Sequence, residues 1–174
     1  MLNADSIVHD RESRVVAVAV DKDHYRIVAT EDIAQGQSIL TIEGQVTGRP
    51  TMYSVQISET AHIDLDDAKL VDKYPERYLW RFLNHHCQPN SVLKGRDLAA
   101  VADIKAGEEV TFNYNANEYN IAAPFRCWCD AHDKTMVRLV RGYKYLSATE
   151  RRQLADLVSP HVLRQAQRDQ QPEA

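Results

Sequence analysis

The sequence has no long apolar run, no excess of positive charge and few cysteines. No apolar stretch approaches the roughly 18 residues of a membrane-spanning helix. The polar start, MLNADSIVHDRESRV, lacks the apolar core of a signal peptide. We therefore expect neither membrane insertion nor secretion. The expected location is intracellular: the cytoplasm, or the nucleus if the host is eukaryotic.

The charge balance excludes a general nucleic-acid footprint. The net charge is −4, from 21 basic and 25 acidic residues, whereas such a footprint needs a basic surface. Basic side chains do gather in Lys134–Arg152, and we interpret them as a solvated face. The 174 residues, 44% of them hydrophobic, suffice for one domain with its own core.

The three cysteines are Cys87, Cys127 and Cys129. Their number is odd, and the last two are spaced C-x-C, too close for easy mutual pairing. Reduced thiols in an intracellular compartment fit this pattern better than a disulfide framework.

Short β-strands dominate the expected secondary structure. β-Branched and alternating apolar residues between turn signals predict strands at 15–20, 25–30, 38–43 and 52–58. The turn chemistry of DKDH, at 21–24, predicts a hairpin between the first two. A further strand pair is predicted at 98–104 and 108–114, around the turn KAGE.

Helical patterns are fewer. Residues Glu76–His85 have helix-type spacing over a short length. A longer helix is predicted from Ser147, which forms a capping box with Glu150. Pro160 should kink or split that helix, and the tail after Gln167 is polar. Many short strands with few helices predict a mainly β fold.

Three segments have unusual chemistry: RFLNHHCQPN at 81–90, AGEEVTFNY at 106–114 and FRCWC at 125–129. In this order they resemble the SET-domain protein lysine methyltransferases. That family has an R-F-x-N-H-x-C-x-P-N motif, a G-E-E motif that ends in Tyr, and often a C-x-C segment. Residues 29–44 also look like the family's opening strands. The resemblance covers roughly residues 15–145.

The resemblance implies a SET-domain fold. This fold has small curved sheets, a knot-like crossing of the chain, short helices and, here, a C-terminal helix. We accordingly divide the chain into an N-terminal segment (1–14), a SET domain (15–119), a post-SET-like segment (120–146), and a C-terminal helix with its tail (147–174).

The resemblance also implies S-adenosylmethionine as the cofactor and methyl transfer to an amine, foremost a protein lysine. Asn84 and His85 would bind the cofactor, whose ammonium and carboxylate need matched partners once buried. Tyr114 corresponds to the catalytic tyrosine of the family. Phe112 and Tyr53 would line the channel for the target lysine.

Two departures from the family pattern concern the cofactor site. His24 and Arg26 stand where the family has a Gly-x-Gly pair against the cofactor. Because glycine permits close backbone approach, the cofactor is expected to be held differently here. Asn113 replaces the commoner Asp beside Tyr114, which removes a charge and adds a hydrogen-bond donor.

The cysteines allow two interpretations. Many family members hold a structural zinc with the central Cys and a C-x-C-x4-C segment, but here Lys134 stands at the fourth position. His132 can complete a Cys3His site with Cys87, Cys127 and Cys129. Alternatively, the cysteines are small buried hydrophobes. Phe125 and Trp128 would then hold the segment over the cofactor's adenine by apolar burial.

Two other functions remain open. The chain can be a SET enzyme that methylates a small-molecule amine. It can also be a non-catalytic SET module that binds a peptide or a partner. The missing glycines at His24 and Arg26 favour the module, and the retained Tyr114 argues against it.

Overall fold

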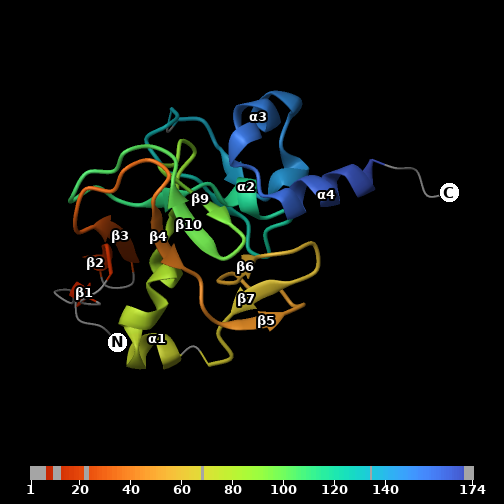
Figure 1. The fold of residues 1–174 in the computed structure, drawn as a ribbon. Coiled ribbons are helices and arrows are strands. Elements are labelled where there is room, and N and C mark those ends of the chain that lie inside the picture. Colours follow the sequence, from red (N-terminus) through yellow and green to blue (C-terminus); the bar gives the residue numbers. More distant parts are fainter. Residues whose placement is uncertain (1–6, 10–12, 22–23, 68, 134, 171–174) are drawn as a thin grey trace.

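Small antiparallel sheets joined by turns and short helices make up this fold (Figure 1). The computed structural model describes residues 7–9, 13–21, 24–67, 69–133 and 135–170. The turn predicted at 21–24 and the end of the predicted tail lie partly outside these residues. The mainly β expectation is confirmed, and the longest described α-helix, of 10 residues, lies at the C-terminal end.

The first sheet has the order β1-β2-β3, with β1 at Ile7–His9, β2 at Val15–Asp21 and β3 at His24–Ala29. The last two confirm the strands predicted at 15–20 and 25–30. Val15, Ala17 and Ile27 are fully buried, so this sheet closes one side of the main hydrophobic core.

Two further three-stranded sheets follow. One has the order β4-β10-β9, with β4 at Ser38–Thr41, β10 at Asp97–Ala100 and β9 at Ser91–Lys94. The other has the order β5-β7-β6, with β5 at Gln45–Thr47, β7 at His62–Asp64 and β6 at Val55–Gln56.

The strand predicted at 52–58 is reduced to β6, and Tyr53 lies in the turn before it. Side-chain hydrogen bonds explain the difference. The Thr51 hydroxyl accepts from the backbone N–H groups of Tyr53 (3.1 Å) and Ser54 (3.2 Å), and the Ser54 hydroxyl accepts from the Thr51 N–H (2.9 Å). These local bonds compete with strand pairing for the backbone donors.

The strand pair predicted at 98–104 and 108–114 is wrong. Strand β10 pairs with β4 and β9, and strand β11 at Thr111–Phe112 pairs instead, in parallel, with β8 at Asn84–His85. The segment between them bridges to other partners, Ile104 to Ile33 and Glu109 to Val28. Long-range partners therefore replace the local hairpin.

The helices before the site are short. Helix α1 covers Lys69–Lys73, and the 3-10 helix η1 covers Pro75–Phe82, where the sequence predicts a helix at 76–85. Helix α2, Tyr114–Asn117, begins directly after β11. Strands β12 (Phe125–Arg126) and β13 (Leu139–Val140) then form an antiparallel pair.

The helices after Ser147 follow the sequence prediction. They are α3 (Ala148–Gln153), η3 (Ala155–Leu157) and α4 (Pro160–Asp169). The short 3-10 helix η2 (Tyr143–Tyr145) precedes them and was not predicted. The capping box of Ser147 and Glu150 is present at the start of α3. Pro160 occupies the first turn of α4, so the predicted helix is split at the proline.

A second hydrophobic cluster joins these helices to the site. Ala116 and Tyr119 pack with Tyr143, Val158 and Val162. In Figure 1, α3 and α4 lie together beside α2. The C-terminal helices therefore support the residues that directly follow Tyr114.

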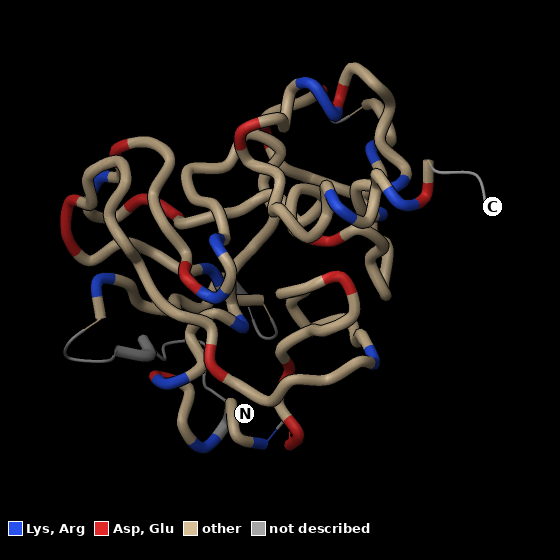
Figure 2. The backbone as a smooth tube through the Cα atoms, turned by 45° about the vertical axis from the view of Figure 1, so that its right-hand side comes forward, with Lys and Arg blue, Asp and Glu red and all other residues tan. Residues whose placement is uncertain are grey.

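Figure 2 shows Lys and Arg interspersed with Asp and Glu along the chain. Arg141, Lys144 and Arg152 are exposed, as the interpretation of 134–152 as a solvated face requires. Lys134 itself lies outside the described residues. Within the described part of the chain, no helix has both the length and the apolar character needed to cross a membrane. The domain boundaries at 15, 120 and 147 stay predictions.

Candidate functional site: two cavities and a cysteine cluster

The parallel pair β8–β11 brings the first two sequence motifs together. Asn84 lies beside Thr111, and His85 beside Phe112. The Asn90 side chain extends this contact, since it donates to the Glu109 carbonyl (2.8 Å) and accepts from the Thr111 N–H (2.9 Å). The predicted chain crossing thus has its hydrogen-bonding basis in two motif asparagines, Asn84 and Asn90.

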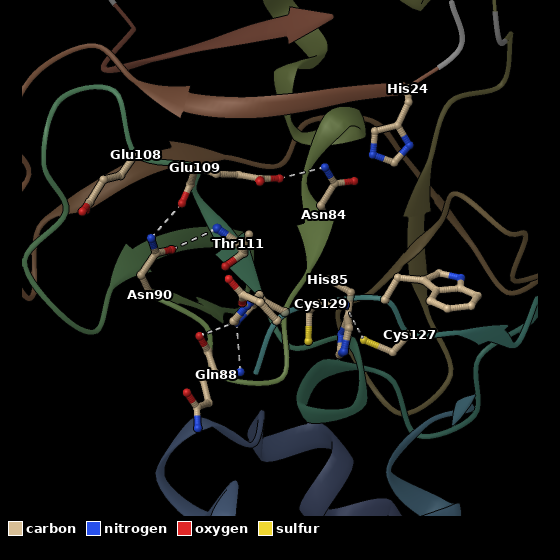
Figure 3. A pocket seen from close by; sticks show the side chains of 13 residues that line it. His24, Asn84, His85, Gln88, Asn90, Glu108, Glu109, Thr111, Cys127 and Cys129 are labelled. Atoms are coloured by element: carbon tan, nitrogen blue, oxygen red, sulfur yellow. Dashed lines mark hydrogen bonds and ion pairs between the residues drawn. The ribbon is translucent and has the colours of Figure 1, made fainter. Parts of the chain in front are cut away.

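Asn84 connects three segments through its side-chain amide. The amide nitrogen donates to the Tyr25 carbonyl and to the Glu109 carboxylate, both at 2.9 Å. Figure 3 shows Asn84 and Glu109 facing each other across the pocket wall. These bonds hold β3, β8 and the segment just before β11 in a fixed arrangement.

A large polar pocket opens beside these residues, with a volume of about 830 Å³. Its lining includes the predicted cofactor residues Asn84, His85 and Trp128, together with Glu108 and Glu109. His24, which replaces a family glycine, also lines the pocket (Figure 3). The volume is of the size that small-molecule and cofactor sites have.

His85 connects this pocket to Tyr114. Its Nδ1 accepts from the Tyr114 N–H at 3.1 Å, which assigns the remaining ring proton of the neutral form to Nε2. Burial, and then the nearby charge of His86 and Arg138, lowers the pKa of His85 to about 3. The ring is therefore neutral at physiological pH and acts as a hydrogen-bond acceptor.

Tyr114 is held at both ends. Its hydroxyl donates to the Leu83 carbonyl at 2.6 Å. Burial, followed by the charges of Glu118 and Glu109, raises the pKa of this hydroxyl above its usual value. Tyr114 therefore stays a neutral hydrogen-bond donor.

Asn113, which departs from the family pattern, has two uses here. Its side-chain oxygen caps α2 by accepting from the Asn115 N–H at 3.0 Å. Its amide nitrogen donates to the Cys87 carbonyl at 3.3 Å. A carboxylate at this position has no donor for the second bond.

A second, narrow cavity of about 80 Å³ is lined by Tyr114 itself. Phe112, Tyr114 and Tyr53 all line it, so the structure brings the two predicted channel residues together with the predicted catalytic tyrosine. Tyr53 is 55% exposed. The Arg81 guanidinium lies 4.2 Å from its ring centre and pairs with Asp64 at 3.3 Å.

The two aromatic residues of the third motif have different positions. Trp128 lines the large pocket, is 60% exposed and stacks with the Arg126 guanidinium at 4.0 Å. Phe125 is not among the described residues that line this pocket. It packs edge-on against His85 (5.9 Å) and Tyr114 (5.8 Å). Trp128 thus edges the large pocket, and Phe125 supports the residues between the two cavities.

The ligand atoms of Cys87, Cys127, Cys129 and His132 lie within 4.8 Å of one another. The Cys87 and Cys127 sulfurs are 3.8 Å apart, about the edge of a tetrahedron with Zn–S bonds of ~2.3 Å. His132 Nε2 is buried with no hydrogen-bond partner in the described residues. Its other ring nitrogen lies 3.3 Å from the Asp133 carbonyl, which can orient the ring.

The three thiols of the cluster differ in acidity, because burial raises the pKa of Cys87 and of Cys127. Burial acts to raise the pKa of Cys129, but hydrogen bonds from the backbone of Cys87 and Ala131 outweigh it and lower the pKa to about 7. A thiolate is the form that binds metal. The donor set therefore fits a Cys3His zinc site, and His132 takes the place that the family spacing gives to residue 134.

Sequence reasoning missed four residues that shape the site. Asn90, Glu109 and Thr111 lie inside the motifs at 81–90 and 106–114. Their membership of the motifs was therefore visible in the sequence, but none of them was assigned a role in the site. Glu118 lies outside the motifs. It lines the narrow cavity. The sequence predicts no helix at 114–118, and without a helix a spacing of four residues does not indicate that Glu118 and Tyr114 share a site.

Comparison with known proteins defines the class. The sequence pattern of the SET domain matches residues 24–115, more than half of the 174-residue chain. This protein belongs to the SET-domain family, and its small sheets, short helices and C-terminal helix are those of a SET fold.

Similar proteins include several histone methyltransferases. The chain is 31% identical over 130 residues to "Histone-lysine N-methyltransferase, H3 lysine-36 specific" of Yarrowia lipolytica, covering 66% of this chain and 17% of that protein. It is 31% identical over 132 residues to the enzyme of the same name from Emericella nidulans, covering 67% and 13%. It is 27% identical over 124 residues to "Histone-lysine N-methyltransferase ASHH2" of Arabidopsis thaliana, covering 62% and 7%. The chain spans less than a fifth of the length of each of these relatives.

Proposed function

We propose that this protein transfers a methyl group from S-adenosylmethionine to the side-chain amine of a protein lysine. The observation that carries the proposal is the position of Tyr114. Its ring lines the narrow aromatic cavity, while its N–H binds His85 in the wall of the large pocket. A transfer reaction between two bound molecules needs two adjoining sites of this kind.

The large pocket supplies matched groups for the cofactor, which provides an electrophilic methyl on a sulfonium. Glu108 and Glu109 offer negative charge for an ammonium, and Asn84 and His85 offer polar atoms. Trp128 can cover an aromatic base by stacking. His24 fills space that glycine leaves open elsewhere in the family, so the wall on that side is made by a side chain.

The narrow cavity prepares the amine. A free lysine has a pKa of about 10.4, yet only the neutral amine is nucleophilic. The aromatic and aliphatic walls of Phe112, Tyr114 and Leu83 disfavour the charged form by desolvation, and solvent takes the proton. Tyr114 and Phe112 then align the amine with the methyl group, which is worth several kcal/mol when pre-arranged.

The exposed residues at the entrance of the narrow cavity favour a protein substrate over a small amine. Tyr53 and Met52 line this cavity and are 55% and 66% exposed, so a lysine side chain can enter while its main chain stays outside. The relatives are named for lysine 36 of histone H3. A histone H3 peptide is therefore the first protein substrate to test.

We further propose that Cys87, Cys127, Cys129 and His132 hold one structural zinc ion. The 3.8 Å sulfur separation and the unpartnered His132 nitrogen support it. The ion would tie the loop that carries Trp128 to the end of the central motif, because Cys87 belongs to that motif and Cys127 and Cys129 flank Trp128. If the cysteines are only small buried hydrophobes, the buried His132 nitrogen has no hydrogen-bond partner among the described residues, which costs free energy.

The test combines cofactor titration with mass spectrometry. Calorimetry should show S-adenosylmethionine binding, and a lysate incubated with labelled cofactor should yield labelled lysine in protein. Label found only in small amines would favour the small-molecule enzyme. Cofactor binding without transfer to either class, or no binding, would favour the non-catalytic module.

A further inference from the structure

One acidic side chain, Glu118, reaches the narrow cavity. The rest of its described lining is aromatic, apolar or hydroxyl-bearing, apart from Arg81. Arg81 already pairs with Asp64 at 3.3 Å. Among the described residues, the ion-pair partner of Glu118 is His62, with Nε2 at 3.5 Å. Because histidine carries no permanent charge, the cavity has a carboxylate that a cationic ligand can match.

The Glu118 carboxylate is held rigidly. Its Oε1 accepts from the Gln56 backbone N–H at 2.6 Å and from the Asn117 amide at 3.3 Å. The Glu118 N–H donates to the Tyr114 carbonyl at 2.8 Å. The residue is only 9% exposed. A buried carboxylate fixed by β6 and α2 is a pre-organised charge, which binds without the cost of ordering a free side chain.

The field of this carboxylate reaches the reacting end of the cavity. After burial itself, the charge of Glu118 is the strongest influence that raises the pKa of Tyr114. Both residues line the same cavity. An alkylammonium that enters among Phe112, Tyr114 and Tyr53 therefore meets aromatic faces and one negative charge, and both attract a cation.

We propose that Glu118 is the residue that selects a positively charged alkylamine for this cavity, over neutral groups of the same shape. The inference rests on the proposed function and names the charge state in which the substrate is recognised. The same carboxylate opposes loss of the amine's proton. Its favourable contribution is therefore to substrate binding, and it does not accelerate the transfer step.

The direct test uses probes that imitate the end of a lysine side chain. n-Butylamine, charged at pH 7, and 1-butanol, neutral and of similar shape, are titrated separately into the whole protein. The Ile121 methyl signal in NMR reports binding, because Ile121 lines the cavity. We expect the wild type to bind butylammonium at least about tenfold more tightly than butanol, a margin of ~1.4 kcal/mol. Equal binding of the two probes, or no binding of either, would overturn the proposal.

The Glu118→Gln variant should lose this preference and keep its affinity for butanol. The change is isosteric, and the remaining side-chain oxygen can still accept from the Gln56 N–H. Glu76→Gln is the matched control, since Glu76 is exposed on η1 and does not line the cavity. A Glu118→Gln variant that retains the preference would contradict the proposal. If that variant does not fold, the wild-type comparison of the two probes still decides.

Enzyme kinetics supply an independent readout. With an active lysine substrate, Glu118→Gln should raise KM about tenfold or more, while kcat should stay the same or rise, because loss of the amine's proton is no longer opposed. A fall in kcat at unchanged KM would contradict the selection role and indicate a structural one. Because the probe titration needs no methyl transfer, failure of Glu118 selection and failure of the proposed activity are separate results.

Discussion

The hydroxyl of Tyr114 donates a 2.6 Å hydrogen bond to the main-chain carbonyl of Leu83. Leu83 immediately precedes β8, so this bond ties the end of one motif to the start of the other. The same ring lies 5.3 Å from His85 and 4.7 Å from Phe112, measured between ring centres. Tyr114 thereby links His85, in the wall of the large polar pocket, to Phe112, in the wall of the narrow cavity.

Tyr114→Phe should lower turnover about 100-fold or more, the scale of losing one oriented donor in a transition state. Affinity for S-adenosylmethionine should change little, since the ring and the N–H to His85 remain. Loss of the bond to the Leu83 carbonyl should also cost about 1 kcal/mol of unfolding free energy. Steady-state kinetics, calorimetry and thermal unfolding measure the three quantities.

Tyr74→Phe is the matched control, because Tyr74 is 40% exposed and does not line either cavity in the described structure. It should retain wild-type turnover. Near-normal turnover of Tyr114→Phe on the true substrate would exclude Tyr114 as the catalytic tyrosine.

Asn84→Ala should weaken cofactor binding first. The change removes the bonds to the Tyr25 carbonyl and the Glu109 carboxylate, so the pocket wall loses its fixed arrangement. We expect at least about a tenfold rise in the Kd for S-adenosylmethionine, equivalent to ~1.4 kcal/mol. Calorimetric titration tests this, with the exposed Asn120→Ala as control. Equal affinities of Asn84→Ala and the control would exclude Asn84 as a cofactor residue.

Phe112 should permit di- or trimethylation, because a phenyl ring beside the amine leaves room for added methyl groups. The family resemblance links a tyrosine at such a position to an extra water and less room. Phe112→Tyr should therefore shift the product towards monomethyl. Intact-mass analysis with excess cofactor measures the product.

Phe82→Tyr serves as the control for this series, since Phe82 packs on Tyr25 and is not among the described residues that line the narrow cavity. A wild-type protein that stops at monomethyl would refute the assignment of Phe112.

Purified protein, prepared without chelator, should carry close to one zinc ion per chain. Cys129→Ser and His132→Ala should both release it, because each removes one of four ligands. Loss of the ion should also loosen the segment after Tyr119, which faster hydrogen exchange would reveal. His24→Ala removes a histidine outside the cluster and should keep the metal. Absence of zinc from the wild type by elemental analysis would exclude the site.

Gly142→Ala should destabilise the protein far more than Gly36→Ala. Both glycines have positive φ, +108° and +87°, so each alanine costs about 1–3 kcal/mol of backbone strain. At Gly142 an added Cβ would also lie 2.6 Å from the Tyr119 carbonyl oxygen, whereas nothing lies within 4 Å at Gly36. Chemical denaturation should separate the two by more than about 1 kcal/mol. Equal losses of unfolding free energy in the two variants would show that the chain around Gly142 and Tyr119 can shift to accommodate the added Cβ.

Local patterns determined much of the secondary structure. The strands at 15–20 and 25–30 were predicted from β-branched runs, and the split of the last helix from Pro160. These features depend on residues close in the chain, so sequence contains the needed information. The motifs 81–90 and 106–114 likewise identified the family and placed Asn84, His85 and Tyr114 near one another.

Strand partners were decided by tertiary structure. The predicted pairing of 98–104 with 108–114 failed because periodicity reports that a segment is extended and half-buried, but not which strand it joins. Residue 104 pairs with Ile33, and Thr111 pairs with Asn84, over separations that no local signal encodes. The prediction of a strand at 52–58 was wrong for a local reason. The hydroxyl groups of Thr51 and Ser54 accept hydrogen bonds from nearby backbone N–H groups, which shortens the strand.

The site shows the same division. The sequence determined which residue types were available: three cysteines, the motif asparagines and Tyr114. Only the fold placed the His132 nitrogen near the three sulfurs and Glu118 among the residues that line the cavity of Tyr114. Both positions depend on how the loops and helices are placed relative to one another, to within a few ångströms. Ligand sets and cavity charges depend on such distances, and sequence spacing does not specify them.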